Sequence, residues 1–201
     1  MNTTPIPSLK AGLRRELLAR RDALPESERA RIAEALVEKI ASLPRYAAAR
    51  SVLATMAIGS EWNTRLFLER ARADGKAVVL PRLTPPPRHL EIHRVGDLDR
   101  DLVPGVWNIP EPDPARCRPV TIADVDFAVV PALAVDLDGY RLGYGAGYFD
   151  RLLAGRGPST YCVAAIPAAF VVESLPHESH DQALDLIVDE RGTRRTRSAK
   201  A

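Results

Sequence analysis

The chain has 201 residues, of which 46% are hydrophobic and 27% are charged, a balance that is typical of a soluble globular protein. Its two cysteines, Cys117 and Cys162, are too few for the disulfide framework of a small secreted protein. No apolar run is long enough to span a membrane, and the N-terminus lacks the basic-then-apolar pattern of a signal peptide. We therefore expect one cytoplasmic domain over residues 1–201 that folds without disulfides.

The net charge of +2 is unevenly distributed. Five basic residues and no acidic ones occupy residues 191–201, and without them 23 basic residues stand against 26 acidic ones. The basic charge therefore belongs to the tail, and no basic face with interleaved aromatic residues points to nucleic-acid binding. We expect flexible termini at residues 1–6 and 191–201. Binding of RNA or an acidic partner by the tail is the alternative interpretation.

Hydrophobic periodicity predicts helices that alternate with strands along most of the chain. Leucines at helical spacing indicate an amphipathic helix over residues 8–22, and a second helix should start near Pro25. The later expected elements are a strand at 51–58, a helix from Asn63 or Thr64 to Asp74, strands at 77–80, 90–95 and 126–133, a helix at 148–153, and strands at 160–166 and 184–188. The prolines of 104–119 predict a long ordered loop or flap. This order indicates an α/β sheet that is covered on both faces.

Residues 136–151 form the most informative segment, because a strand, a glycine-rich loop and a helix follow one another there. Gly143, Gly145 and Gly147 allow the backbone to approach a ligand closely, and backbone N–H groups in such a turn can bind phosphate. The spacing matches neither the P-loop nor the dinucleotide-binding pattern. Flanking arginines and an aspartate favour a phosphate or anion site over a purely structural turn. The aspartate, Asp150, is a natural ligand for nucleotide-bound Mg²⁺.

Three further groups of polar residues are candidates for the same site. Glu61 follows the first strand, where α/β sheets commonly bind ligands, and could accept hydrogen bonds from ring N–H groups. Lys10 and Arg14 are four residues apart on one helix face and could contact phosphates. Asp181 could supply a second carboxylate to a metal ion held by Asp150. For the last segment, a zinc pair of His177 and His180 is the less favoured alternative, because no third ligand is evident.

Taken together, these segments resemble the 5-formyltetrahydrofolate cyclo-ligase family, also called methenyltetrahydrofolate synthetase. The resemblance spans about residues 8–190, and its most specific motif is the run of residues 136–151. Residues 10–14, 61–64, 107–112 and 175–181 match further motifs in the same order. The departures are Phe149 in place of a tyrosine, Asn108 in place of a glycine and Asp189 in place of a threonine. The resemblance implies a three-layer α/β/α sandwich with a largely parallel or mixed central sheet.

The resemblance also implies a role for each matching residue. Catalytic roles fall to Arg141, Tyr148 and Arg151. ATP binding falls to Lys10, Arg14, Arg141, Gly143, Tyr144, Gly145, Ala146, Gly147, Tyr148 and Phe149. Folate binding falls to Met56, Glu61, Tyr144, Gly145, Ala146, Gly147 and Tyr148, and Mg²⁺ binding to Asp150 and Asp181.

The activity that the resemblance implies is ATP-dependent cyclisation of 5-formyltetrahydrofolate to 5,10-methenyltetrahydrofolate, through a phosphorylated formyl group. ADP and phosphate would be released, and Mg²⁺ would accompany ATP. We expect a monomer whose partners are these two substrates, with neither nucleic acid nor a membrane among them. A nucleotide- or folate-binding module without catalysis is the alternative from a different functional class.

Overall fold

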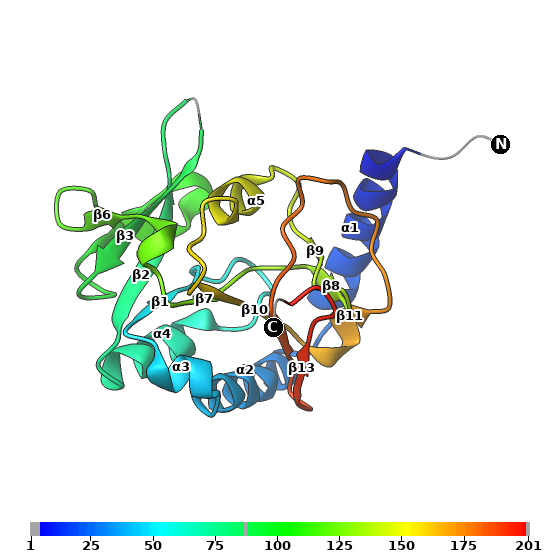
Figure 1. Ribbon diagram of the computed structural model, residues 1–201, viewed down its shortest axis with the longest axis horizontal. Helices are drawn as coiled ribbons and strands as arrows, with labels where there is room; N and C mark the ends of the chain where they lie inside the picture. Colours follow the sequence, from blue (N-terminus) through cyan, green and yellow to red (C-terminus); the bar gives the residue numbers. More distant parts are fainter. Residues whose placement is uncertain (1–4, 87, 200–201) are drawn as a thin grey trace.

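A computed structural model of the protein describes residues 5–86 and 88–199. Its centre is an eight-stranded sheet in the order β13-β12-β10-β7-β1-β2-β3-β6 (Figure 1). The strands, in that order, are Thr193–Arg195, Leu186–Val188, Tyr161–Ala165, Phe127–Val129, Ser51–Leu53, Ala77–Leu83, Leu90–Val95 and Arg118–Val120. The run from β12 to β2 is parallel, whereas β13, β3 and β6 pair antiparallel with their neighbours. The predicted mixed, largely parallel α/β sheet is confirmed.

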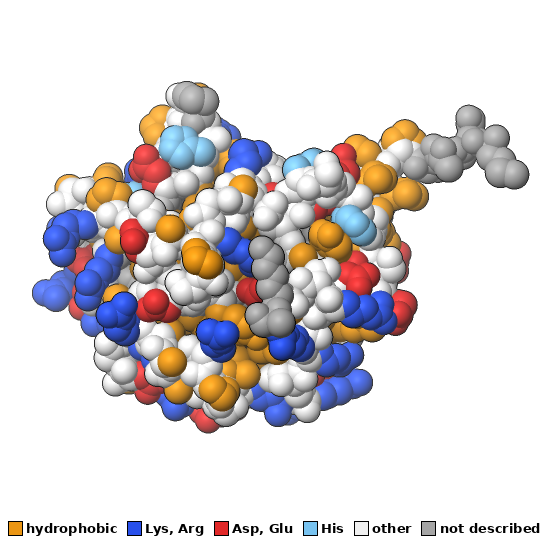
Figure 2. Space-filling model, in the orientation of Figure 1, with side chains coloured by type: hydrophobic (Ala, Val, Ile, Leu, Met, Phe, Trp, Pro, Cys, Tyr) orange, Lys and Arg blue, Asp and Glu red, His pale blue; other side chains and the backbone are white. Residues whose placement is uncertain are grey.

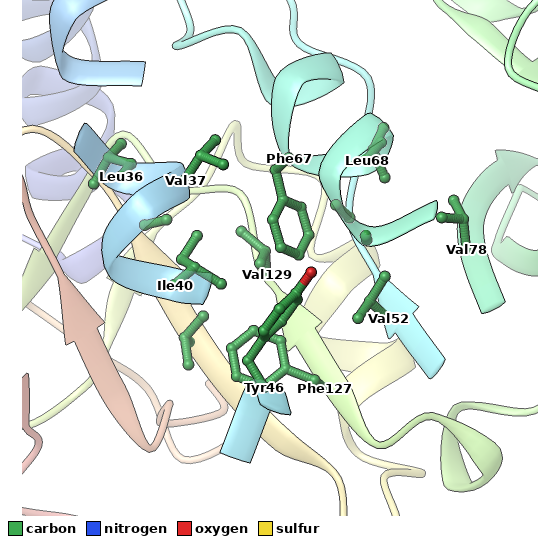
Figure 3. Close-up of a cluster of buried hydrophobic side chains, with 14 of the residues drawn as sticks. Leu36, Val37, Ile40, Tyr46, Val52, Phe67, Leu68, Val78, Phe127 and Val129 are labelled. Carbon is green, nitrogen blue, oxygen red and sulfur yellow. The ribbon is translucent and has the colours of Figure 1, made fainter. Parts of the chain in front are cut away.

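One face of the sheet is covered by α2 (Glu26–Ala41), α3 (Pro44–Ala48) and α4 (Thr64–Ala73), which lie below the sheet in Figure 1. Leucine, isoleucine and phenylalanine recur at helical spacing on α2 and α4, so each helix turns one apolar stripe toward the sheet. Figure 3 shows the resulting cluster, in which Tyr46 and Phe127 meet edge to face with ring centroids 5.7 Å apart. The Tyr46 hydroxyl donates to Asp74 at 2.8 Å and so remains satisfied at the edge of this core.

The opposite face carries α1 (Ile6–Asp22), α5 (Tyr148–Leu153) and a second, three-stranded sheet. This small sheet has the order β11-β8-β9, with strands Val171–Val172, Ala134–Asp136 and Arg141–Leu142. Short 3₁₀ turns, η2 (Ile122–Asp124) and η3 (Ala168–Phe170), complete this layer. Leu17, Leu142, Leu153 and Phe170 pack beneath it as a second hydrophobic cluster. Helices thus lie on both faces of the central sheet.

Several strand boundaries differ from those predicted. The expected strand at 51–58 ends at Leu53, and the expected strand at 126–133 ends at Val129, after which the chain continues into β8 of the small sheet. Conversely, β2 continues through Pro81 to Leu83. Proline is tolerated there because β1 pairs only with residues 77–79, so the missing N–H lies beyond the partner strand.

Two segments predicted to be irregular contain strands. Residues 104–119, expected as a long loop, contain β5 (Pro110–Pro112), which pairs with β4 (Leu102–Pro104) around a 3₁₀ turn, η1 (Val106–Asn108). The expected flexible tail contributes β13, which pairs with β12 and is fastened by Arg194, whose Nη2 donates to Asp189 at 2.7 Å. Most of the expected flexible N-terminus, residues 1–4, and residues 200–201 lie outside the described residues.

Within the described residues, no helix is both long and apolar enough to cross a membrane. On the face drawn in Figure 2, basic side chains stand singly or in small groups, with acidic side chains between them.

Candidate active site

The candidate site begins at the carboxyl ends of three neighbouring parallel strands, β1, β7 and β10. A narrow cavity of about 30 Å³ lies there. Its lining includes residues within two positions of these strand ends, namely Thr55, Val130 and Ile166, and also Glu61 and Arg21. Carboxyl ends of parallel strands share one edge of a sheet, which is where open α/β folds bind ligands. The cavity walls are mostly apolar, with a few polar groups among them.

Glu61 is held in place by three groups from different parts of the chain. Its Oε2 accepts from the backbone N–H of Ile58 at 2.9 Å, and its Oε1 accepts from the Tyr144 hydroxyl. The Arg21 guanidinium lies 3.7 Å from Oε1. Burial, together with the negative charge of Glu61, raises the pKa of the Tyr144 hydroxyl, which therefore stays protonated as a donor.

Arg21 is a site residue that the sequence analysis missed. It is 6% exposed, and its Nε donates to the Ser60 hydroxyl at 2.9 Å while Nη1 donates to the Tyr144 hydroxyl at 2.8 Å. The signal for it was present on α1, because Lys10, Arg14, Leu17 and Arg21 follow one another at helical spacing. This stripe faces inward, so α1 crosses the site with three cations and one apolar anchor.

The glycine loop lies against this stripe of α1. Arg14 Nε donates to the Gly143 carbonyl at 2.8 Å. Gly145 has φ +105, and a Cβ added there would lie 3.3 Å from Cζ of Arg14, so both conformation and space favour glycine. None of the backbone N–H groups of residues 144–147 donates a hydrogen bond to another described residue. These groups, with Ala146 exposed at the loop tip, remain available to an external acceptor.

Arg14 and Arg151 approach the loop from two sides. The Arg151 guanidinium lies 5.1 Å above the ring of Tyr148, near Gly147. Neither arginine pairs with a carboxylate within residues 5–86 and 88–199. Two cations without an acidic partner, beside free N–H groups, make this part of the site suited to an anion.

The other two predicted cations are paired with the predicted metal ligands. Arg141, whose side chain is 4% exposed, lies 3.1 Å from Asp150, and Lys10 lies 2.6 Å from Asp181. Burial favours a raised pKa for Asp181, but the bond from Lys10 and the Glu178 N–H outweigh it and hold the pKa below its usual range. The backbone N–H of Gln182 donates to Asp150 at 3.1 Å, which brings the two carboxylates into one neighbourhood.

The donors around Asp150 and Asp181 fit a magnesium ion that is shared with a nucleotide. Asp150 uses only Oδ1 for its contacts with Arg141 and Gln182, so its Oδ2 remains for a ligand. Asp181 uses Oδ2 for Lys10 and Glu178, and its Oδ1 lies 3.8 Å from His180 Nε2. The described residues contain no cluster of three or more acidic, histidine or cysteine side chains that could hold a metal. Mg²⁺ needs only one or two carboxylates when phosphate and water supply the rest.

Other residues of the predicted site or motifs pack against the hydrophobic cores, stack on a ring or hold loops together. Met56 is packed against the core beneath α2 and α4, and the Phe149 ring packs against the opposite core. His177, half of the alternative zinc pair, stacks on Tyr140 with ring centroids 3.8 Å apart. Upstream in the motif, buried Asp136 accepts from the backbone N–H of Tyr140 at 2.9 Å and of Leu175 at 2.9 Å. This aspartate joins two loops and does not face a ligand.

Comparison with known proteins identifies relatives over nearly the whole chain. The model of the 5-formyltetrahydrofolate cyclo-ligase family matches residues 7–190. A 5-formyltetrahydrofolate cyclo-ligase of Mycolicibacterium smegmatis is 33% identical, with 89% of this chain and 92% of the relative covered. The enzyme of that name from Mus musculus is 27% identical over 94% of this chain and 98% of its own length.

Solved structures with a similar fold are methenyltetrahydrofolate synthetases as well. The Aquifex aeolicus 5,10-methenyltetrahydrofolate synthetase superposes with a TM-score of 0.83 at 32% identity and covers 96% of this chain and 95% of its own. A 5,10-methenyltetrahydrofolate synthetase from Mycoplasma pneumoniae, 21% identical, shares the fold with a TM-score of 0.69, covering 90% of this chain and 98% of its own. Sequence relatives, the family match and the shared fold together place the chain in the 5-formyltetrahydrofolate cyclo-ligase family, as an enzyme of that class.

Proposed function

We propose that this cyclo-ligase converts 5-formyltetrahydrofolate and ATP to 5,10-methenyltetrahydrofolate, ADP and phosphate through a phosphorylated formyl group. The observation that carries the proposal is the contrast within one site. An oriented carboxylate, Glu61, lies at one end, and a glycine loop with unpaired cations lies at the other. Tyr144 belongs to the loop and touches Glu61, so ligands bound at the two ends would meet there.

The chemistry requires activation because the N5-formyl group is an amide and its carbon is a weak electrophile. In the first step the formyl oxygen attacks the γ-phosphorus of ATP, a P–O bond forms, and the bond to ADP breaks. The lone pair of N10 then adds to the formyl carbon. The C–O bond breaks, phosphate leaves with the former formyl oxygen, and N10 loses its proton. Neither step needs a side-chain nucleophile, so catalysis rests on positioning and charge stabilisation.

The residues divide this work between the two ends of the site. Glu61, with its oxygens already oriented, would accept hydrogen bonds from the ring N–H groups of the folate. Tyr144 and Tyr148 would form the wall between the substrates. Arg14, Arg151 and the backbone N–H groups of the loop would bind the phosphates, because these groups lack acidic partners in the described part of the chain. Met56 and Phe149 would support the pocket from the core.

Lys10 and Arg141 would change partners when ATP binds. Each is now neutralised by a predicted metal ligand, Asp181 or Asp150. Mg²⁺ bound with ATP would offset phosphate charge, and these two carboxylates would hold it. The freed cations could then turn to the phosphate oxygens. We further propose that the enzyme is a monomer.

The direct test is an assay with 5-formyltetrahydrofolate, ATP and Mg²⁺. We expect the absorbance of methenyltetrahydrofolate to rise, with one ADP formed for each product molecule and no product when ATP is omitted. Well-folded protein that binds both substrates but forms neither product nor ADP would instead indicate a binding module. Light scattering on the same preparation would test the monomer.

A further inference from the structure

Arg21 joins the two halves of the site, and the activity described above assigns it no role. Its guanidinium reaches the loop after β1 through Ser60 and the glycine loop through Tyr144, which is 123 residues away in sequence. Among the described residues, Glu61 is the only carboxylate that pairs with Arg21. The side chains of Arg21 and Glu61 are 8% and 10% exposed. A cation so well buried is costly unless its donors are used.

The contacts of Arg21 control where Glu61 and Tyr144 lie. The Tyr144 hydroxyl accepts a hydrogen bond from Arg21 and donates one to Glu61, so its direction is fixed by both neighbours. Glu61 is held by this hydroxyl on one oxygen and by the Ile58 N–H on the other. Removing Arg21 would leave the bond to Glu61 as the only hydrogen bond of the Tyr144 hydroxyl among the described residues, so Glu61 Oε1 would be held less firmly than Oε2.

A purely structural role would need Arg21 to fasten α1, but the helix has other anchors. Leu17 is 3% exposed within the hydrophobic cluster, Arg14 binds the Gly143 carbonyl, and Lys10 binds Asp181. Ser60, the third partner of Arg21, also donates to Asp22 on α1. The helix therefore remains attached without Arg21, whereas nothing else among the described residues donates to the Tyr144 hydroxyl.

We infer that Arg21 is a positioning residue for the folate, which aligns the Glu61 carboxylate and the Tyr144 hydroxyl as one acceptor surface without touching the reacting atoms. This inference rests on the proposed binding of the folate ring at Glu61. A planar guanidinium is suited to the task because it donates to Ser60 and Tyr144 in fixed directions, which an ammonium cannot do.

The test compares Arg21→Met and Arg21→Lys with Arg15→Gln, an exposed residue on the same helix. Arg21→Met should raise the KM for 5-formyltetrahydrofolate about tenfold or more, as expected for a lost charged hydrogen bond. The KM for ATP should stay within about twofold of the wild type, as should both constants in Arg15→Gln. Arg21→Lys keeps the positive charge, so its KM for 5-formyltetrahydrofolate should lie between those of Arg21→Met and the wild type. It also provides an active variant if Arg21→Met does not fold.

A double-mutant cycle with Tyr144→Phe separates positioning from general damage. If Arg21 acts through Tyr144, the double variant should be no worse in folate KM than the weaker-binding single variant. Fully additive effects would overturn the inference, and so would equal rises in the KM values of both substrates. An active Arg21→Met enzyme with unchanged folate KM would overturn it while leaving the proposed function intact. Absence of turnover by the wild type would instead refute the proposed function.

Discussion

The two ends of the site differ in whether their charged groups are paired with other groups of the protein. At the Glu61 end, Arg21, Tyr144 and Glu61 satisfy one another through two hydrogen bonds and an ion pair. At the glycine-loop end, Arg14 and the N–H groups of residues 144–147 have no acidic or carbonyl partner among the described residues, apart from the single bond from Arg14 to Gly143. One end is complete without a ligand, whereas the other is left to be completed by an anion.

This difference suits a site for two substrates, because one end is already ordered by its own hydrogen bonds and the other has polar groups free for a ligand. A satisfied network orients a neutral ring by shape and hydrogen bonds, and it costs little to maintain. Unpaired cations beside a glycine turn repel one another in a folded protein, and a bound phosphate would offset that repulsion.

The largest effect is expected from Glu61→Gln. The substitution removes the carboxylate that pairs with Arg21 and that we propose binds the folate ring. We expect kcat/KM for 5-formyltetrahydrofolate to fall about 100-fold, in the upper range for a charged hydrogen bond. The KM for ATP should hardly change. Steady-state kinetics with Glu16→Gln on the exposed face of α1 as the control would check this. A change confined to the KM for ATP would reverse the assignment of the two ends.

Arg14→Gln should have the next largest effect, at the other end. Loss of one unpaired cation should raise the KM for ATP about tenfold, the value of one charge-assisted contact. The KM for 5-formyltetrahydrofolate should stay unchanged, because the hydrogen bond of Arg14 goes to the Gly143 carbonyl and to none of Arg21, Tyr144 and Glu61. Initial rates at varied ATP and saturating folate measure the change. Parallel rises in both constants would show that the ends are not independent.

Lys10→Met tests whether the paired cations behave differently from the unpaired ones. The variant leaves Asp181 without its cation, so we expect the free energy of unfolding at pH 7 to fall by about 2 kcal/mol, less than for a fully buried pair. The folded-state pKa of Asp181 is lowered, so this stabilisation is present above the usual pKa and is lost as the pH falls through the lowered one.

Urea unfolding of Lys10→Met and wild type at pH 7, and again below about pH 4, would measure that difference. The gap between the two proteins should narrow on acidification. Arg31→Met, which removes an exposed positive charge from α2, is the control and should show no gap at either pH. A gap that widened on acidification would contradict the ion pair.

The smallest effect is expected from Phe149→Tyr, which restores the residue usual in the family. The Phe149 ring packs against the hydrophobic cluster below α5. An added hydroxyl should change the KM for ATP by no more than about twofold. Kinetics of this single variant would show whether position 149 belongs to the ATP end. A large gain in ATP affinity would mean that it does.

Local patterns predicted the glycine loop, the helix face of Lys10 and Arg14, and the position of Glu61 at a strand end. Each depends on residues that are close in sequence. Arg21 was missed because its partner Tyr144 is 123 residues away and nothing local marks the pair. Only the continuation of the α1 stripe through Leu17 to Arg21 hinted at it.

Short strands were missed for a related reason. Strands β8 and β9 are three and two residues long, too short for a period-2 pattern, and the turn between them is held by Asp136, which accepts from the N–H of Tyr140. Tail residues 193–195 form a strand because β12 offers an open edge, which the composition of the tail does not reveal. Each of these short strands therefore depends on partners that are not apparent from the local sequence.

The division of the site into two ends is tested most directly by equilibrium binding. Calorimetric titration of wild type, Arg14→Gln and Glu61→Gln with a non-hydrolysable ATP analogue, and separately with 5-formyltetrahydrofolate, measures each end alone. We expect Arg14→Gln to weaken binding of the ATP analogue only, and Glu61→Gln to weaken binding of the folate only. Loss of both ligands in both variants, to the same degree, would contradict it.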